Sequence, residues 1–128
     1  NDRHHPETTQ AVYAALSDDF SKSSARVEWW TDHATFDVAA TTPYRGDING
    51  VIVEVHNKCA NVRQRIHRKV RAAAKLGYGV HIVVTEEATA QSFLQEFIRE
   101  YAGSEATTGS YEDGELNLGS MIHPDDIL

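Results

Sequence analysis

Two acidic residues stand inside apolar runs of the sequence, where an ionised side chain is costly to bury. Asp37 lies within the run TFDVAA, and Glu54 lies within the run VIVEVH. A carboxylate in such a place costs free energy unless a cation or a metal ion neutralises it. Side chains alternate along a strand, so Glu54 and His56 share one face, and a neighbouring strand about 4.8 Å away can bring Asp37 beside Glu54. The spacing therefore predicts a cluster of two carboxylates and one imidazole.

This predicted cluster has the donor atoms that Mg²⁺ or Mn²⁺ requires. Mg²⁺ takes few protein oxygens and keeps several waters together with oxygens of a substrate phosphate. Bound by Asp37 and Glu54, the ion would lower the pKa of a coordinated water and neutralise charge that develops on a phosphate under attack. His56 would then orient the attacking water. The alternative is a pair of partly buried carboxylates that neighbouring arginines neutralise, or that face solvent at a strand edge.

A second feature is a run of cations in an otherwise acidic chain. The 128 residues include 19 Asp and Glu against 12 Lys and Arg, with a formal net charge of −7. Residues 57–75 nevertheless hold more than half of the cations and no acid: Lys58, Arg63, Arg65, Arg68, Lys69, Arg71 and Lys75. Cations at helical spacing repel one another, and a polyanion relieves that repulsion. We therefore expect these residues, apart from Lys69, to bind a nucleic-acid backbone; the alternative is a solvated helix face.

Hydrophobic spacing and turn signals predict the elements that position these residues. Apolar residues at helical spacing predict a first helix over about 6–21. β-Branched and aromatic runs predict four strands, at 26–31, 35–41, 51–56 and 80–85. Two further helices are expected, at 61–76 and 86–102. Residues 103–128 are rich in Gly, Ser and acids, so we expect a partly mobile extension with one edge strand at 115–118.

The resulting order, α-β-β-β-α-β-α, defines the expected architecture. Three meandering strands, a crossover helix and a fourth strand that returns in parallel give a mixed central sheet with helices on both faces. We therefore predict an α/β (α+β) core domain over residues 1–102, followed by an acidic, Gly- and Ser-rich C-terminal extension over 103–128.

The helix at 61–76 divides its residues between two faces. Its apolar stripe consists of Val62, Ile66, Val70 and Ala73. Four cations point away from that stripe: Arg65, Arg68, Arg71 and Lys75. Arg63 and Lys69 lie on its two borders, where a long side chain can reach the neighbouring layer.

The element order and these motifs resemble the PD-(D/E)XK nuclease superfamily over about residues 6–102. The segments that carry the resemblance are ETTQAVYAAL, RVEWW, FDVAA, GVIVEVHNK and GYGVHIVV. They look most like the competence-protein and restriction-endonuclease-like branches. The resemblance implies a restriction-endonuclease-like core, with Asp37 and Glu54 as metal ligands and Glu7 as an accessory acid on the first helix.

His56 would occupy the place where this superfamily usually has a Lys. An imidazole is mostly neutral at pH 7, so it supplies less positive charge than an ammonium. Other members move the Lys elsewhere, and Lys58 and Lys69 are available here. Lys69 is the better candidate, because it borders the buried stripe of its helix instead of lying in a turn. The resemblance also allows a catalytically inactive descendant that binds nucleic acid or another protein.

We therefore expect a cytoplasmic, Mg²⁺- or Mn²⁺-dependent nuclease that hydrolyses phosphodiester bonds in DNA, with RNA as the alternative substrate. A homodimer stays open, and so do further domains of a longer chain, because the sequence begins at Asn1 and not at Met. No apolar run is long enough for a membrane span, and the single Cys59 excludes an internal disulfide framework. Trp29 and Trp30 offer surfaces on which unpaired bases could stack, with one of the two expected to pack in the core.

Overall fold

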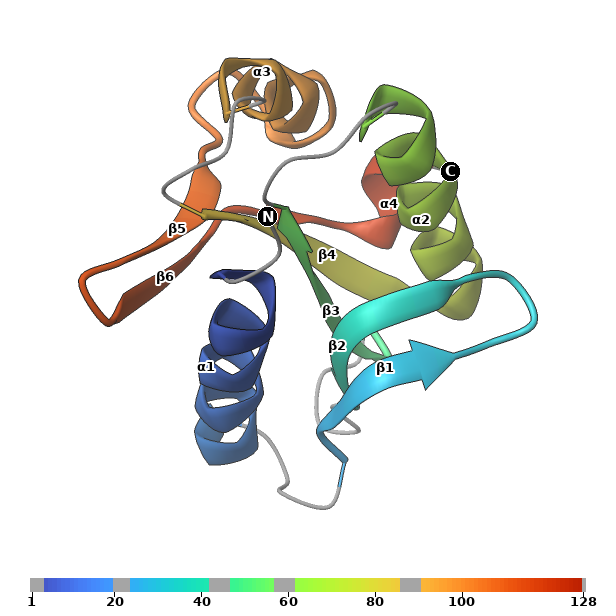
Figure 1. The fold of residues 1–128 in the computed structure, drawn as a ribbon. Helices are drawn as coiled ribbons and strands as arrows, with labels where there is room; N and C mark the ends of the chain where they lie inside the picture. Colours follow the sequence, from blue (N-terminus) through green and yellow to red (C-terminus); the bar gives the residue numbers. More distant parts are fainter. Residues whose placement is uncertain (1–3, 20–23, 42–46, 57–61, 86–90, 128) are drawn as a thin grey trace.

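The computed structural model describes residues 4–19, 24–41, 47–56, 62–85 and 91–127. Its elements are α1 (His4–Asp19), β1 (Arg26–Trp30), β2 (Thr35–Thr41), β3 (Gly50–His56), α2 (Val62–Leu76), β4 (Tyr78–Thr85), α3 (Gln91–Ala102), β5 (Thr108–Glu112), β6 (Glu115–Gly119), β7 (Met121–Ile122) and α4 (Pro124–Ile127). The elements up to α3 follow the predicted order α-β-β-β-α-β-α (Figure 1). None of the helices in these ranges combines the length and the apolar composition that crossing a membrane requires.

A mixed sheet runs through the molecule in the order β1-β2-β3-β4-β5-β6. Strands β1, β2 and β3 are antiparallel neighbours, whereas β4 runs parallel to β3 and β5 runs parallel to β4. A parallel return needs a crossover connection, and α2 lies in the one between β3 and β4. The runs of β3 and β4, which are rich in Val and Ile, therefore belong to central strands that are covered on both faces.

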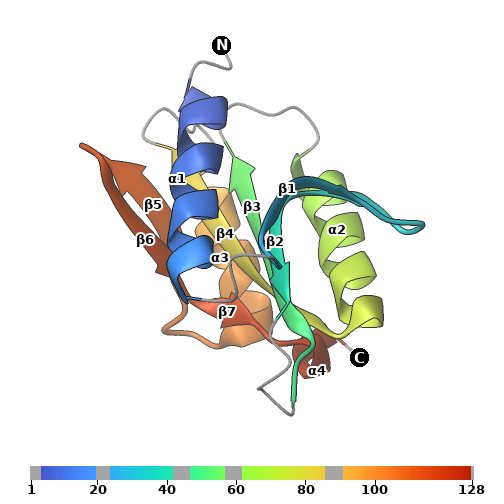
Figure 2. The same ribbon diagram turned by 90° about the horizontal axis from the view of Figure 1, so that it is seen from below.

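Helices cover both faces of this sheet, as predicted (Figure 2). On one face α1 buries Val12 and Leu16 in a cluster with valines of β2, β3 and β4. On the other face α2 and α3 bury a larger cluster that includes Ile52, Ile66, Ile82, Leu94 and Phe97. Because side chains alternate along β3, Glu54 lies on the same face as Ile52, which is the face that α2 covers.

The residues of α2 divide between its two faces as the helical wheel predicts. Ile66, Val70 and Ala73 are buried against the sheet. Four cations are exposed on the outer face: Arg65, Arg68, Arg71 and Lys75. The side chain of Lys69 is partly buried, which agrees with its border position. The side chains of Val62 and Arg63, and the whole of Lys58, lie outside the described residues.

The described part of the predicted extension, residues 103–127, adds three strands to the sheet, where the sequence predicted one edge strand. β5 pairs with the end of β4, β6 pairs with β5, and β7 pairs with β4 at Val80 and His81. The hairpin between β5 and β6 turns at Asp113 and Gly114, whose φ angles of 52° and 78° suit a two-residue turn that matches the strand twist. β5 and β7 therefore pair with the edge of β4 that β3 leaves open.

Gly50, the first residue of β3, allows the neighbouring strands to approach closely. A Cβ atom at Gly50 would overlap the carbonyl oxygen of Ala40 and lie 2.6 Å from Cε2 of Tyr78. Backbone atoms cannot move aside without disturbing the sheet, so Gly50→Ala should lower the free energy of unfolding by about 1–3 kcal/mol. Urea denaturation measures this loss.

Gly79 on β4 provides the matched control for this prediction. A Cβ atom there would overlap the Sδ atom of Met121, which is the far end of a flexible side chain. Met can change its rotamer to make room, so Gly79→Ala should cost less than Gly50→Ala. Equal losses for the two variants would contradict the close approach of backbone at Gly50.

Candidate active site

The two acidic residues singled out in the sequence meet where the regular pairing of β2 and β3 ends. Val38 lies opposite Val53, and continuing that register by one residue places Asp37 opposite Glu54. The amide of Asp37 donates a hydrogen bond of 2.9 Å to Oε2 of Glu54, and the amide of Val55 donates one of 2.8 Å to Oδ2 of Asp37. Each carboxylate is therefore fixed by the backbone of the opposite strand. The structure brings Asp37 and Glu54 together, as their spacing predicted.

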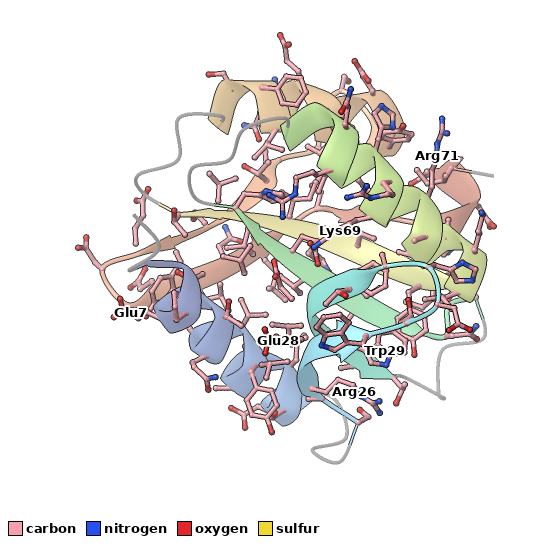
Figure 3. All side chains as sticks on the ribbon, turned by 45° about the vertical axis from the view of Figure 1, so that its right-hand side comes forward. Glu7, Arg26, Glu28, Trp29, Lys69 and Arg71 are labelled. Carbon is pink, nitrogen blue, oxygen red and sulfur yellow. The ribbon has the colours of Figure 1, made fainter. Side chains whose placement is uncertain are left out.

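Helix α2 places a cation directly against this pair. Nζ of Lys69 donates a hydrogen bond of 2.6 Å to Oε1 of Glu54. The Glu54 side chain is 1% exposed and the Lys69 side chain 17% exposed, so the ion pair is almost entirely removed from water. Such charge-assisted bonds are strong where little water competes for them. Figure 3 shows Lys69 reaching from α2 towards the sheet, while Arg71 points outward from the same helix. We call Asp37, Glu54 and Lys69 the carboxylate cluster.

Burial dominates the electrostatics of Glu54. Its pKa rises from 4.5 to about 7, mainly because burial removes the carboxylate from water and also because the negative charge of Asp37 is close. The charge of Lys69 and the hydrogen bonds from Lys69 and the Asp37 amide lower the pKa, but they do not cancel the effect of burial. At neutral pH the two carboxylates therefore attract either a proton or a further cation.

The donor atoms of the cluster fit Mg²⁺ or Mn²⁺. Among the described residues, no group of three or more His, Cys, Asp or Glu side chains is arranged to hold a metal ion. Mg²⁺ needs fewer protein ligands than that, because it binds through one or two carboxylates and fills its other positions with waters and substrate phosphates. Asp37 and Glu54 supply two hard oxygen ligands, and a bound cation would relieve the repulsion that raises the pKa of Glu54.

The other residues that the sequence predicted for the site are not part of the contacts described above for the carboxylate cluster. His56 is buried on the same face of β3 as Glu54, two residues further along the strand. Glu7 is exposed in the first turn of α1, and Figure 3 shows it well away from Lys69. The structure therefore does not bring Glu7 to the carboxylate cluster. Lys58 and Cys59 lie outside the described residues.

Strand β1 has an irregular residue, Glu28, next to the position of Asp37 on β2. Glu28 lies in β1 between the registered pairs Val27–Val38 and Trp29–Phe36, which places it level with Asp37. Its φ of 48° is left-handed, a conformation that costs a residue with a side chain about 1 kcal/mol. No Gly or Asn marks the position, so the sequence carries no signal for this interruption of the strand.

The two tryptophans of β1 differ in burial, as the sequence predicted. The ring of Trp29 packs against Tyr78 and Phe36, with centroid distances of 5.1 and 6.0 Å, and Arg26 lies over it at 5.6 Å. Trp30 is 76% exposed. Trp30 is therefore the member of the pair with a ring available for stacking.

The outer face of α2 and the turn between β1 and β2 line an open pocket of about 660 Å³, which we call the basic pocket. Its lining includes three of the cations predicted to bind nucleic acid, namely Arg68, Arg71 and Lys75. It also includes three residues that the sequence analysis did not single out, namely His33, Gln64 and His67. None of the described residues that line it is acidic. Helical spacing predicts the three cations, but not the approach of His33 from a distant turn.

Comparison of the chain with protein-family models, with curated proteins and with solved structures found no match. The resemblance to the PD-(D/E)XK nuclease superfamily therefore stays a prediction, and the features that bear on function are the carboxylate cluster and the basic pocket.

The raised pKa of Glu54 predicts that stability falls as the pH rises from about 5 to 8. The folded state binds the Glu54 proton more tightly than the unfolded chain does, so this group favours folding at low pH and loses that contribution as the pH passes through about 7. The difference between the two pKa values corresponds to at most about 3 kcal/mol. Urea denaturation of the wild type across this range, and of Glu54→Gln, measures the effect, which the variant should lack.

Glu96→Gln, on the exposed side of α3, is the matched control and should keep the wild-type pH dependence. A Glu54→Gln variant with an unchanged pH dependence would mean that the Glu54 carboxylate is not buried as described.

Proposed function

We propose that this protein is a metal-dependent nuclease that hydrolyses phosphodiester bonds in DNA. The observation that carries the proposal is the carboxylate cluster, in which two acids on neighbouring strands and a Lys from the crossover helix converge. Structural ion pairs seldom require two carboxylates side by side in a core, because their repulsion adds to the cost of burial. A site that handles the charge of a phosphate group accounts for both acids and for the cation.

The roles of the three residues follow from their geometry. Asp37 and Glu54 would hold Mg²⁺ or Mn²⁺, which when bound supplies positive charge to the phosphate oxygens during hydrolysis. Lys69 fixes the orientation of Glu54 through its 2.6 Å hydrogen bond, and its ammonium can also donate to a phosphate oxygen. Lys69 would thus take the part of the Lys that is expected two residues after Glu54, where this chain has His56.

The outer face of α2 supports a nucleic-acid substrate. Arg65, Arg68, Arg71 and Lys75 are exposed on the helix that also provides Lys69, so backbone contacts and the cluster are tied to one rigid element. About four phosphate contacts would make the logarithm of the binding constant fall with the logarithm of salt concentration at a slope of about −3 to −4. DNA is the proposed substrate, and RNA is tested beside it.

One observation favours a second candidate, a catalytically inactive module that binds nucleic acid or a protein partner. Glu54 is 1% exposed and Lys69 already stands against it, so the ammonium could replace the metal ion permanently. Binding on the outer face of α2 would then continue without hydrolysis. The two candidates differ in whether the cluster admits a metal ion.

Cleavage assays separate the two candidates. Plasmid, single-stranded DNA and RNA are incubated with Mg²⁺ or Mn²⁺ and the wild-type protein, Glu54→Gln, or the surface control Glu96→Gln. The wild type and Glu96→Gln should cut DNA, whereas Glu54→Gln should lose roughly 100-fold or more of the rate, because removing a metal ligand removes stabilisation of the transition state. Circular dichroism confirms that each variant is folded.

Cutting that survives Glu54→Gln would contradict the proposed site. Salt-dependent binding without any cutting, in either metal, would favour the inactive module.

A further inference from the structure

The cations of the basic pocket lie close enough together to act on one ligand. Arg68, Arg71 and Lys75 occupy successive turns along one side of α2 and span about 10 Å of helix axis. An anion in this concave surface therefore experiences all three cations at short range, and no carboxylate is among the described residues that line it.

His67 is held in a fixed orientation at this pocket. Its Nδ1 lies 3.0 Å from the hydroxyl of Tyr101, and its ring meets the edge of Phe97 at a centroid distance of 4.9 Å and an interplanar angle of 79°. When the Tyr101 hydroxyl donates to Nδ1, the proton of the neutral imidazole resides on Nε2. His67 can then donate a hydrogen bond to an anion in the pocket without needing a charge of its own.

The opposite wall is also rigid. The Thr31 hydroxyl accepts hydrogen bonds from the amides of His33 and Ala34, at 3.1 and 3.0 Å, and donates one of 2.7 Å to the carbonyl oxygen of Ala34. The Thr31 amide donates to that same oxygen at 3.0 Å. These bonds close the turn and place His33 against α2. The neighbouring Asp32 is exposed, but it does not line the pocket.

The size and charge of the pocket suit a phosphorylated nucleotide unit better than a stretch of ordinary backbone. Its volume of about 660 Å³ falls within the range of sites that enclose a small organic ligand. A phosphate monoester carries roughly −1.5 to −2 charges at pH 7, whereas each backbone diester carries one. Three cations on one side of α2 favour the more highly charged group, and the planar guanidinium groups of Arg68 and Arg71 match its oxygens.

We propose that the basic pocket binds the terminal phosphate monoester of a nucleic-acid strand. The choice of nucleic acid as the ligand rests on the proposed function. Besides the three cations, this site gives a role to four residues that are not part of the carboxylate cluster: His33, Gln64, His67 and Tyr101. Gln64 lies one turn before His67 and Arg68 and supplies a neutral amide donor to the same ligand.

Fluorescence anisotropy in EDTA, where metal-dependent cleavage cannot occur, tests this site. The probes are single strands of one sequence that carry a 5′-phosphate, a 3′-phosphate or no terminal phosphate. The fluorescent label is attached at the end opposite the phosphate, and the unphosphorylated strand is prepared with the label at either end. A nucleoside monophosphate is added as competitor to separate recognition of a free nucleotide from recognition of a strand end. We expect one phosphorylated strand to bind roughly fivefold more tightly than the unphosphorylated strand.

Two substitutions that each remove one positive charge from α2 test whether the preference for a terminal phosphate arises in the basic pocket. Arg71→Ala should remove the preference for the phosphorylated strand, whereas Arg65→Ala, on the same helix but outside the lining, should lower the affinity for all strands alike and keep the preference. Tyr101→Phe should reduce the preference without a change of charge, and the ¹⁵N shifts of His67 should show a smaller share of the Nε2-protonated tautomer than in the wild type. That spectroscopic change would not follow from a purely structural role of Tyr101.

Equal affinity for phosphorylated and unphosphorylated strands overturns the inference, as does an equal loss of preference in Arg71→Ala and Arg65→Ala. Neither result bears on the cleavage assay, which depends on Glu54. Conversely, a preference for phosphorylated ends in a protein that cuts nothing would leave the pocket established and the nuclease proposal refuted.

Discussion

The contact between Lys69 and Glu54 is the interaction on which the centre of this fold depends. Glu54 lies in a central strand and is removed from water, so an unpaired carboxylate there would be strongly unfavourable. Lys69 supplies the compensating charge from α2, and the backbone of β2 supplies the amide of Asp37 as a second donor. One buried side chain therefore joins two strands and the crossover helix, and it fixes the relation of α2 to the sheet.

The two faces of α2 connect this buried pair to the surface. Lys69 reaches inward to Glu54, while Arg68 and Arg71 lie on the outer face and line the basic pocket. Because a helix is a rigid element, an anion held by the pocket keeps a constant relation to the carboxylate cluster. The net charge of −7 belongs to the chain as a whole, whereas residues 57–75, which include most of α2, carry seven Lys and Arg residues and no acid. That separation of charge within one chain suits a polyanionic ligand.

The sequence predicts the arrangement of β2, β3 and α2 better than it predicts the pairing of the C-terminal strands or the residues that tertiary packing brings together. Alternation along two strands places Asp37 beside Glu54, and a helical wheel places Lys69 at the border of the buried stripe, because both arguments depend on local periodicity. The pairing of β5 and β7 with β4 depends on contacts that are distant in sequence, so local spacing predicts only the edge strand at 115–118, which overlaps β6. His33 joins the basic pocket through tertiary packing, and the left-handed Glu28 has no marker residue, so neither could be predicted from spacing.

A double-mutant cycle on the stability of Glu54→Gln, Lys69→Met and the combined variant tests the central contact most directly. The measurement is made by urea denaturation at pH 8, above the raised pKa of Glu54. Lys69→Met should be much more destabilising in the wild type than in the Glu54→Gln background, with a coupling energy of about 2 kcal/mol or more. A coupling energy near zero would contradict the account, since Lys69 would then not hold a buried Glu54.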